Sequence, residues 1–177
     1  MKCPGRAGWT VWITGLPGSG KSAISRALAK KLEESRIAVE ILSSDDMRRY
    51  LTPNPTYSEE ERNLVYNALA FTARMLTRSG TNVIIDATGN RRKYRDYCRR
   101  LIGKFAEVYV RCPLEICVER ESSRVDGMYA PRGIYKKAIA GESSTVPGIG
   151  APYEKPKSPE VVVDSSKNSP EECAVAI

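Results

Sequence analysis

The residues whose types and spacing most clearly indicate a chemical function form one glycine-rich segment near the start of the chain. The segment matches the pattern G-x-x-x-x-G-K-[ST] in full and reads Gly15-Leu16-Pro17-Gly18-Ser19-Gly20-Lys21-Ser22. In such a segment backbone N–H groups converge on phosphate oxygens, the lysine reaches the β- and γ-phosphates, and the serine hydroxyl ligates Mg²⁺. The pattern therefore predicts an ATP-binding loop that continues to Ala23, with Lys21 as a catalytic group and Ser22 as a metal ligand.

The residues around this loop agree with that interpretation. The apolar, β-branched run Trp9–Thr14 predicts a strand before the loop, and Ile24, Leu28 and Leu32 predict a helix over Ser22–Leu32 after it. The alternative is a glycine-rich turn without function, which would match the pattern by chance in roughly one chain of this length in a hundred. The strand–loop–helix context makes chance rarer still, so we predict ATP binding.

Phosphoryl transfer also needs groups that hold the metal and orient the acceptor hydroxyl. Because the chain contains no histidine, carboxylates are the candidates. Asp45, or its neighbour Asp46, follows the predicted strand Val39–Leu42, and Asp86 follows the predicted strand Val83–Ile85. The carboxyl ends of strands are where open α/β sheets bind ligands. We therefore predict Asp45 as a catalytic carboxylate and Asp86 as a metal contact through water.

Each aspartate also has a structural interpretation. Asp45 or Asp46 could cap a helix around Met47–Leu51, and Asp86 could cap the end of its strand together with Thr88. An acidic residue is expected beside a phosphate-binding loop, and this expectation favours the functional interpretation of Asp45 or Asp46. The choice between Asp45 and Asp46 stays open, as does the role of Asp86.

A basic, aperiodic stretch over residues 120–135 predicts a lid. The basic residues that bracket this stretch are Arg120, Arg124, Arg132, Lys136 and Lys137. Arginines on a closing segment can exclude water from ATP and neutralise charge in the transition state. We predict ATP contacts for Arg120 and Arg132; a solvated basic loop is the alternative.

A second basic cluster lies between Arg91 and Arg100. We expect most of it to form an exposed helix face, with Arg92 near enough to a strand end to contact an anionic substrate. A nucleic-acid surface is not favoured, because the stacking aromatics it would use are limited to Tyr94 and Tyr97.

The bulk composition narrows the function further. The net charge is +7, which favours anionic partners such as nucleotides. Absence of histidine excludes Ser-His triads and His-ligated metals. Five cysteines without a Cys-x-x-Cys pair indicate reduced thiols. No stretch approaches the 18 apolar residues of a membrane span, and residues 1–8 lack the apolar core of a signal peptide, so we expect a cytoplasmic protein without a membrane partner.

Strands and helices alternate along the chain, which is typical of a parallel sheet covered on both faces. The remaining predicted strands are Ala106–Val110 and Val161–Val163. Further helices are predicted from a Ser58/Glu61 capping box to Gly80, over Tyr94–Leu101, after Pro113, over Ile134–Ala140 and after Ser169. The apolar residues that predict the helix before Gly80 are Leu64, Val65, Leu69, Met75 and Leu76.

These elements predict an α/β fold of the P-loop kinase type. It would have three layers, a central parallel sheet with helices on both faces, and an arginine-rich lid. Residues 1–177 would form a single domain, with the lid at approximately 120–135 and a substrate-site loop at approximately 141–160, because an irregular stretch that long within a compact domain usually has a function.

With these residues located, the chain resembles the adenylylsulfate kinases, P-loop kinases that use Mg-ATP to phosphorylate the 3′-hydroxyl of adenosine 5′-phosphosulfate. The likeness covers nearly the whole chain. It is carried by WITGLPGSGKSAISRALAKKL (12–32), EVYVRCPLEICVER (107–120), GIYKKAIAGE (133–142) and GIGAPYEKPKSPEVVVD (148–164). The Pro-Tyr-Glu-x-Pro segment is fairly specific to that family, whereas the P-loop is not.

The resemblance implies roles for particular residues. Asp45 falls on the acidic residue that acts on the acceptor hydroxyl, and Arg48 and Arg62 fall on arginines that hold the phosphosulfate. Tyr57 replaces a phenylalanine that stacks on the adenine. Lys136 and Ile149 lie in segments that close the substrate site. A homodimer is implied as well, although the residue pattern shows no exposed apolar stripe that demands one.

The middle of the chain departs from the family pattern. Leu-Asp-Gly-Asp-Asn is replaced by Leu42-Ser43-Ser44-Asp45-Asp46, an asparagine is replaced by Val65, and Ile-Ser-Pro is replaced by Asp86-Ala87-Thr88-Gly89-Asn90. The last segment is similar to polynucleotide kinases and seryl-tRNA kinases. The leading hypothesis is an ATP-dependent kinase of adenosine 5′-phosphosulfate. Two alternatives accompany it. One is a P-loop kinase of another acceptor, such as a polynucleotide end, an aminoacyl-tRNA or a small hydroxyl compound, and the other is a nucleotide-binding module without catalysis.

Overall fold

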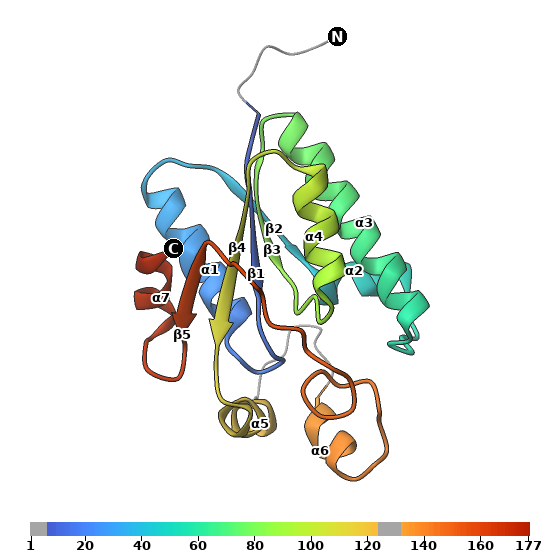
Figure 1. Ribbon diagram of the computed structural model, residues 1–177. Helices are drawn as coiled ribbons and strands as arrows, with labels where there is room; N and C mark the ends of the chain where they lie inside the picture. The colour runs from blue at the N-terminus through green and yellow to red at the C-terminus, as the bar shows by residue number, and fades with distance from the viewer. Residues whose placement is uncertain (1–6, 124–131) are drawn as a thin grey trace.

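The computed structural model describes residues 7–123 and 132–177. In this part of the chain five parallel strands form one sheet, as predicted (Figure 1). The strands are β1 (Thr10–Thr14), β2 (Val39–Ser43), β3 (Asn82–Asp86), β4 (Phe105–Arg111) and β5 (Val161–Asp164). Their order is β2-β3-β1-β4-β5, so β1, which leads into the P-loop, lies at the centre of the sheet.

The register of the strands brings the predicted site residues to one edge of the sheet. Ile13 of β1 and Ser43 of β2 are both paired with Asp86 of β3. The first residues after β1 form the P-loop, and the first after β2 include Asp45. Phosphate loop and carboxylates therefore meet where three neighbouring strands end.

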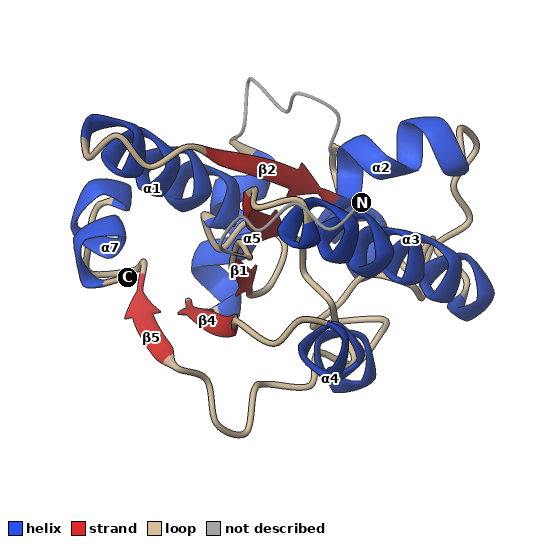
Figure 2. Cartoon of the chain, turned by 90° about the horizontal axis from the view of Figure 1, so that it is seen from above, coloured by secondary structure: helices blue, strands red, loops and turns tan. Residues whose placement is uncertain are grey.

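Helices cover both faces of the sheet, which gives the three predicted layers (Figures 1 and 2). They are α1 (Lys21–Glu34), α2 (Ser44–Leu51), α3 (Glu59–Arg78), α4 (Arg92–Leu101), α5 (Leu114–Ser122), α6 (Ile134–Ile139) and α7 (Pro170–Ala176). The face beneath α1 and α7 includes Ile13, Ile84 and Val108, and the face beneath α3 and α4 includes Trp12 and Val83. Strands buried on both faces explain the uninterrupted apolar runs in the sequence.

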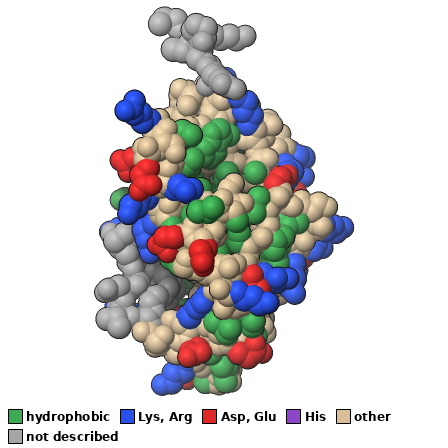
Figure 3. All heavy atoms as spheres, turned by 90° about the vertical axis from the view of Figure 1, so that its left-hand side faces the viewer, with side chains coloured by type: hydrophobic (Ala, Val, Ile, Leu, Met, Phe, Trp, Pro, Cys, Tyr) green, Lys and Arg blue, Asp and Glu red, His purple; other side chains and the backbone are tan. Residues whose placement is uncertain are grey.

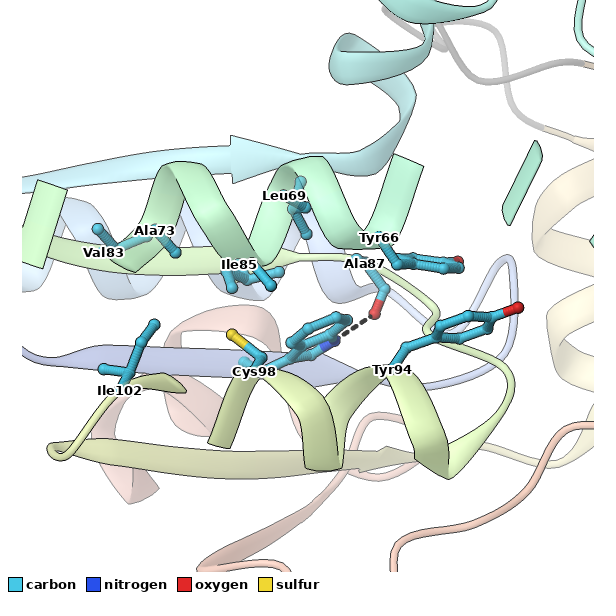
Figure 4. Close-up of a cluster of buried hydrophobic side chains, with 11 residues drawn as sticks. Tyr66, Leu69, Ala73, Val83, Ile85, Ala87, Tyr94, Cys98 and Ile102 are labelled. Atoms are coloured by element: carbon cyan, nitrogen blue, oxygen red, sulfur yellow. Dashed lines mark hydrogen bonds between the residues drawn. The ribbon is translucent and has the colours of Figure 1, made fainter. Parts of the chain in front are cut away.

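The layer beneath α3 and α4 also orders the segment after β3. Tyr66, Leu69 and Ala73 point from α3 into this layer (Figure 4). The Trp12 indole N–H donates to the carbonyl of Ala87 at 2.9 Å, the bond drawn as a dashed line in Figure 4. The main chain that follows Asp86 is thus anchored to the central strand.

A third apolar cluster supports the P-loop from below. It contains buried side chains of the β4–α5 connection, α5, α6 and the segment after α6, namely Cys112, Cys117, Tyr135, Ala138 and Val146. The Tyr135 hydroxyl donates to the carbonyl of Pro17 at 2.9 Å and so ties α6 to the P-loop. Burial raises the pKa of Tyr135, which keeps the hydroxyl protonated as a donor.

Several expectations differ from the structure. Of the apolar residues that predicted α3, Val65 and Leu69 are buried together with Ala73, whereas Leu64 and Met75 are exposed on the other side of the helix. The capping box at the start of α3 is incomplete: Ser58 accepts from the Glu61 N–H at 3.2 Å, but the Glu61 carboxylate bonds elsewhere. The middle of the predicted lid, with Arg124, lies outside the described residues.

Candidate active site

A cleft of about 1120 Å³ opens at the carboxyl ends of β1, β2 and β3. Its wall contains most residues predicted from the sequence, namely Pro17, Gly18, Gly20, Lys21, Ser22, Ala23, Asp45, Asp46, Arg48, Tyr57, Arg62, Asp86, Arg120 and Arg132. A volume of this size is sufficient for two bound nucleotide-sized molecules to meet in one site.

The P-loop is shaped to bind an anion. Gly20 caps α1 in the left-handed conformation with a φ of 91°, and no side chain caps the helix or places negative charge in its first turn. The first N–H groups of α1 therefore point towards the cleft without a side-chain acceptor, as a phosphate site requires. A Cβ atom at Gly18 would collide with the carbonyl of Cys117, so the loop can pack on α5 only with glycine there.

Lys21 and Ser22, the last two residues of the motif, are the first two residues of α1. Lys21 is buried and donates from Nζ to the carbonyl of Leu16 at 2.9 Å, within the loop itself. Ser22 lines the cleft at the start of α1. Gly15, Leu16 and Ser19, also predicted to bind ATP, do not line the cleft.

The two adjacent aspartates have different surroundings. Ser43, not either aspartate, caps α2: its Oγ accepts from the N–H groups of Asp45 at 3.2 Å and Asp46 at 3.4 Å. The interpretation of an aspartate as the helix cap is therefore wrong. Asp45 is partly buried in the cleft wall, whereas Asp46 is exposed and lies 3.5 Å from Arg49. The geometry favours Asp45 as the group that reaches a substrate.

Asp86 is the last residue of β3 and is buried in the floor of the cleft. Among the described residues no side chain or N–H donates a hydrogen bond to its carboxylate, so the proposed capping pair with Thr88 does not form. A buried carboxylate without such a partner, in the same cleft as Ser22, fits a hard cation that keeps most of its ligands as water and phosphate. No cluster of three or more acidic, cysteine or histidine side chains that could hold a metal ion exists in the described ranges.

Opposite the P-loop, two arginines flank Tyr57. The guanidinium carbons of Arg48 and Arg62 lie 4.6 Å and 5.8 Å from the centre of the Tyr57 ring. Both arginines are buried, and Tyr57 has a φ of 57°, a conformation that costs free energy in a residue other than glycine. Burial raises the pKa of the Tyr57 hydroxyl, and the nearby Asp45 charge adds to this effect. We call these three residues the arginine–tyrosine cradle.

Glu61 holds the cradle together. Its carboxylate accepts hydrogen bonds from the Arg48 guanidinium, from the Tyr57 N–H at 3.0 Å and from the Thr56 hydroxyl at 2.8 Å. The sequence indicated Glu61 only as a helix-capping residue. No local signal identifies it, because Arg48 is thirteen positions earlier in the chain.

Arg62 is fixed by three acceptors from separate segments. It donates to the carbonyl of Tyr57 at 3.0 Å, to the side-chain oxygen of Asn90 at 3.3 Å and to the carbonyl of Thr145 at 2.6 Å. Asn90 in turn donates to the carbonyl of Pro152 at 3.1 Å. The divergent 86–90 segment and the 145–155 segment therefore position an arginine of the cradle together.

Arg120 is linked to the P-loop through Ser165. Its guanidinium donates to the carbonyl of Ser165 at 2.8 Å, and the Ser165 hydroxyl donates to the carbonyl of Ser19 at 2.7 Å. Arg132, at the other end of the predicted lid, also lines the cleft. Both residues therefore line the same cleft as Lys21 and Ser22.

Three predicted substrate residues lie outside the cleft wall. Arg92 donates to the carbonyl of Lys155 at 3.2 Å, Lys136 is exposed on α6, and Ile149 lines a separate hollow of about 820 Å³. Lys137, the neighbour of Lys136, lines the cleft instead. The family resemblance indicated Lys136 for the substrate site, whereas in the structure Lys137 is the lysine of α6 that lines the cleft.

The second basic cluster is largely neutralised. Arg95, expected on an exposed face, is 1% exposed and pairs with Glu107, while Arg91 pairs with Glu154 and Arg99 with Glu160. Figure 3 shows a different face, on the side of α1 and α7, where basic and acidic side chains are likewise interspersed. These pairs leave little charge at α4 for binding nucleic acid. No helix in the described ranges is long and apolar enough to cross a membrane.

The sheet order, the P-loop at the central strand and the carboxylates beside it define an ATP-dependent phosphotransferase of the P-loop kinase class. A family model described as "Adenylylsulphate kinase" matches residues 7–164. A probable adenylyl-sulfate kinase from Archaeoglobus fulgidus is 42% identical over 160 residues, which cover 90% of this chain and 97% of that protein. One from Pyrococcus abyssi is 41% identical and covers 93% of this chain and 90% of its own length.

The solved structures agree with these relatives. The APS kinase CysC of Mycobacterium tuberculosis, solved in complex with AMPPNP and APS, superimposes with a TM-score of 0.84 at 32% identity. The match covers 96% of this chain and 94% of that one. The chain belongs to the adenylylsulfate kinase family.

Proposed function

We propose that this protein transfers the γ-phosphoryl group of ATP to the 3′-hydroxyl of adenosine 5′-phosphosulfate, giving 3′-phosphoadenylylsulfate and ADP. One observation carries the proposal: a single cleft joins the P-loop to the arginine–tyrosine cradle. Two guanidinium groups suit a phosphosulfate anion, and the ring of Tyr57 suits an adenine. The activity for which the relatives are named supports the same acceptor.

Residues of the chain itself position the phosphates of ATP and the acceptor hydroxyl. The N–H groups of the P-loop hold the β- and γ-phosphates, and Lys21 leaves the Leu16 carbonyl to neutralise their charge. Arg120 and Arg132 add positive charge beside the γ-phosphoryl group while it is transferred. The acceptor hydroxyl is oriented in line with the γ-phosphorus by Asp45, which accepts its proton as the new bond forms.

The proposed metal site uses Ser22 and Asp86. The Ser22 hydroxyl would ligate Mg²⁺ directly, and the buried Asp86 carboxylate would hold it through water. When bound, the ion neutralises charge on the β- and γ-phosphates.

The departures from the family pattern are compatible with this acceptor. Val65 is fully buried, so its side chain belongs to the core and not to the cleft wall. Asn90, from the divergent 86–90 segment, supplies an amide that holds Arg62. We place the reaction in the cytoplasm, where the four described cysteines, all free thiols, would stay reduced.

The test is a transfer assay with γ-labelled ATP, Mg²⁺ and a panel of acceptors. The panel contains adenosine 5′-phosphosulfate, AMP, a 5′-hydroxyl oligonucleotide and an aminoacylated tRNA. We expect rapid labelling of the phosphosulfate alone, and none with Lys21→Ala. Labelling of either nucleic acid, or ATP binding without transfer to any acceptor, would refute the proposal.

A further inference from the structure

Tyr66 lines the active-site cleft, although it belongs to none of the motifs that predicted the site. The residue lies on the inner side of α3, and its ring packs on the ring of Tyr94 with 4.4 Å between the ring centres. In Figure 4 the Tyr66 hydroxyl lies at the end of the ring that points away from Leu69 and Ala73, the apolar neighbours on the same helix. The ring is therefore part of the core, and the hydroxyl is the part of the side chain that can reach the cleft.

The position of this hydroxyl is fixed by the segment after β3. Its oxygen accepts a hydrogen bond from the Gly89 N–H at 3.1 Å. Gly89 has a φ of 48°, and a Cβ atom there would collide with the Trp12 indole, so the main chain is held closely at this point. A phenol can accept and donate at the same time. Among the described residues no acceptor takes the Tyr66 proton, which leaves the O–H able to donate to a molecule in the cleft.

The hydroxyl borders the arginine–tyrosine cradle. Arg62 and Tyr66 are four positions apart and so lie on the same side of α3. Their side chains bond to consecutive residues, because Arg62 donates to Asn90 and Tyr66 accepts from Gly89. Burial lowers the pKa of Arg48, and Tyr66 is the neighbour that opposes this shift most, so the phenol is also near the other arginine of the cradle.

Two departures from the family pattern meet at Tyr66. Val65 replaces an asparagine, and the segment Asp86–Asn90 replaces Ile-Ser-Pro. Val65 is fully buried and has no polar group to offer the cleft, whereas Tyr66, the next residue, lines the cleft and bonds to the replaced segment. One hydrogen bond therefore joins the two departures, and together they position a hydroxyl donor in the cleft wall.

We propose that the Tyr66 hydroxyl donates a hydrogen bond to an anionic oxygen of the acceptor that Arg48 and Arg62 bind, and so contributes to acceptor specificity. This inference rests on the proposed function, because it concerns the acceptor bound in the cradle. Guanidinium groups carry no acceptor for the phenol proton, so the two arginines and the tyrosine all require the same kind of ligand atom. A hydrogen bond from a hydroxyl to an ionised oxygen is about twice as strong as one between neutral groups.

The test is Tyr66→Phe, which removes the hydroxyl and keeps the ring that packs on Tyr94 and Trp12. We expect KM for adenosine 5′-phosphosulfate to rise about tenfold or more, while KM for ATP stays within about twofold. Equilibrium binding of the phosphosulfate without ATP should weaken by a similar factor. The matched control is Tyr94→Phe, because this buried hydroxyl has no hydrogen-bond partner in the described ranges and does not line the cleft. Its removal should leave both KM values unchanged.

A purely structural role of the hydroxyl would give a different result. If the hydroxyl only held Gly89, its loss would loosen a segment that begins with Asp86, the proposed metal contact, and KM for ATP would rise together with KM for the acceptor. Urea unfolding of the variant measures whether the fold is weakened as well. Equal rises in both KM values, or an unchanged KM for the phosphosulfate in an active enzyme, would overturn the inference and leave the proposed function intact. A wild type that does not phosphorylate the phosphosulfate would refute both.

Discussion

Arg48 and Glu61 form an ion pair inside the wall of the cleft, with only 6% and 9% of their side chains exposed. The same carboxylate accepts from the Tyr57 N–H. One acidic residue therefore fixes both the direction of a cradle arginine and the unfavourable backbone conformation of the cradle tyrosine. A buried guanidinium without its partner would destabilise the folded protein. The pair therefore links the conformation of the α2–α3 connection to the geometry of the site.

Glu61→Gln should weaken acceptor binding selectively. The amide keeps the shape but loses the charge that holds Arg48, so we expect KM for adenosine 5′-phosphosulfate to rise about ten- to a hundredfold, while KM for ATP stays within about twofold. Steady-state kinetics with each substrate varied separately measures both values.

The control is Glu59→Gln, two residues earlier on α3. Glu59 pairs with Lys93 at 2.6 Å, but both side chains are about half exposed, so its loss should change neither KM. Equal rises in both KM values for Glu61→Gln would indicate general damage to the fold and contradict the positioning role.

Asp45→Asn and Asp46→Asn should separate the two candidate carboxylates. Asp45 is partly buried in the cleft and Asp46 is exposed near Arg49. We expect kcat to fall about 10²- to 10⁴-fold for Asp45→Asn, as for loss of a general base, and less than about threefold for Asp46→Asn. The reverse order in single-turnover rates would assign the role to Asp46.

How well the sequence predicted the site depends on how local each signal is. The P-loop and Asp45 are recognised from neighbours within a few residues, and both lie in the cleft as predicted. Arg62, in contrast, bonds to Asn90 and Thr145, which are 28 and 83 positions later in the chain. Such pairs form only when the crossover order of the strands brings the segments together, so residue spacing cannot indicate them.

The same reason explains the errors at the helices. Apolar residues at helical spacing predict which face of a helix is buried. Leu64 and Val65 are adjacent and both apolar, so the spacing alone does not determine which of them points towards the sheet. Similarly, the arginines of α4 predicted an exposed basic face because their partners Glu107, Glu154 and Glu160 lie on other elements. The element order was predicted more reliably than the direction of individual side chains.

Arg95→Ala should destabilise the fold far more than other changes in the same cluster. Arg95 donates to Glu107 and to the carbonyls of Gly89 and Glu154, and its removal leaves the buried Glu107 carboxylate with only the more distant Arg99, at 3.8 Å, as a cationic partner. We expect a loss of about 3–5 kcal/mol in the free energy of unfolding in urea.

Arg100→Ala is the matched control on the exposed side of α4, with an expected change below about 0.5 kcal/mol. If the two variants lost equal stability, the buried network would not have the structural role described here.

The stability of the protein should depend on Glu160 at low pH. The hydrogen bond from Arg99 lowers the pKa of the Glu160 carboxyl from 4.5 to about 2. A lowered pKa means that the charged pair stabilises the fold above about pH 4.5, and that this stabilisation is lost as the pH falls towards 2. The carboxylate is partly exposed, so the effect should be small.

Urea unfolding of the wild type and Glu160→Gln between pH 6 and pH 2 measures this loss. The difference between the two proteins should shrink as the pH falls, whereas Glu34→Gln, at the exposed end of α1, should differ little from the wild type throughout. A constant difference for Glu160→Gln would show that the carboxylate acts through its shape rather than its charge.

The most direct test of the proposed acceptor compares adenosine 5′-phosphosulfate with AMP, which lacks the sulfate, at saturating Mg-ATP. If the arginine–tyrosine cradle binds the phosphosulfate, kcat/KM for the phosphosulfate should exceed that for AMP by about a hundredfold or more. Phosphorus NMR of the product should place the new phosphate on the 3′-oxygen. Equal kcat/KM values, or a phosphate at any other position, would contradict the account.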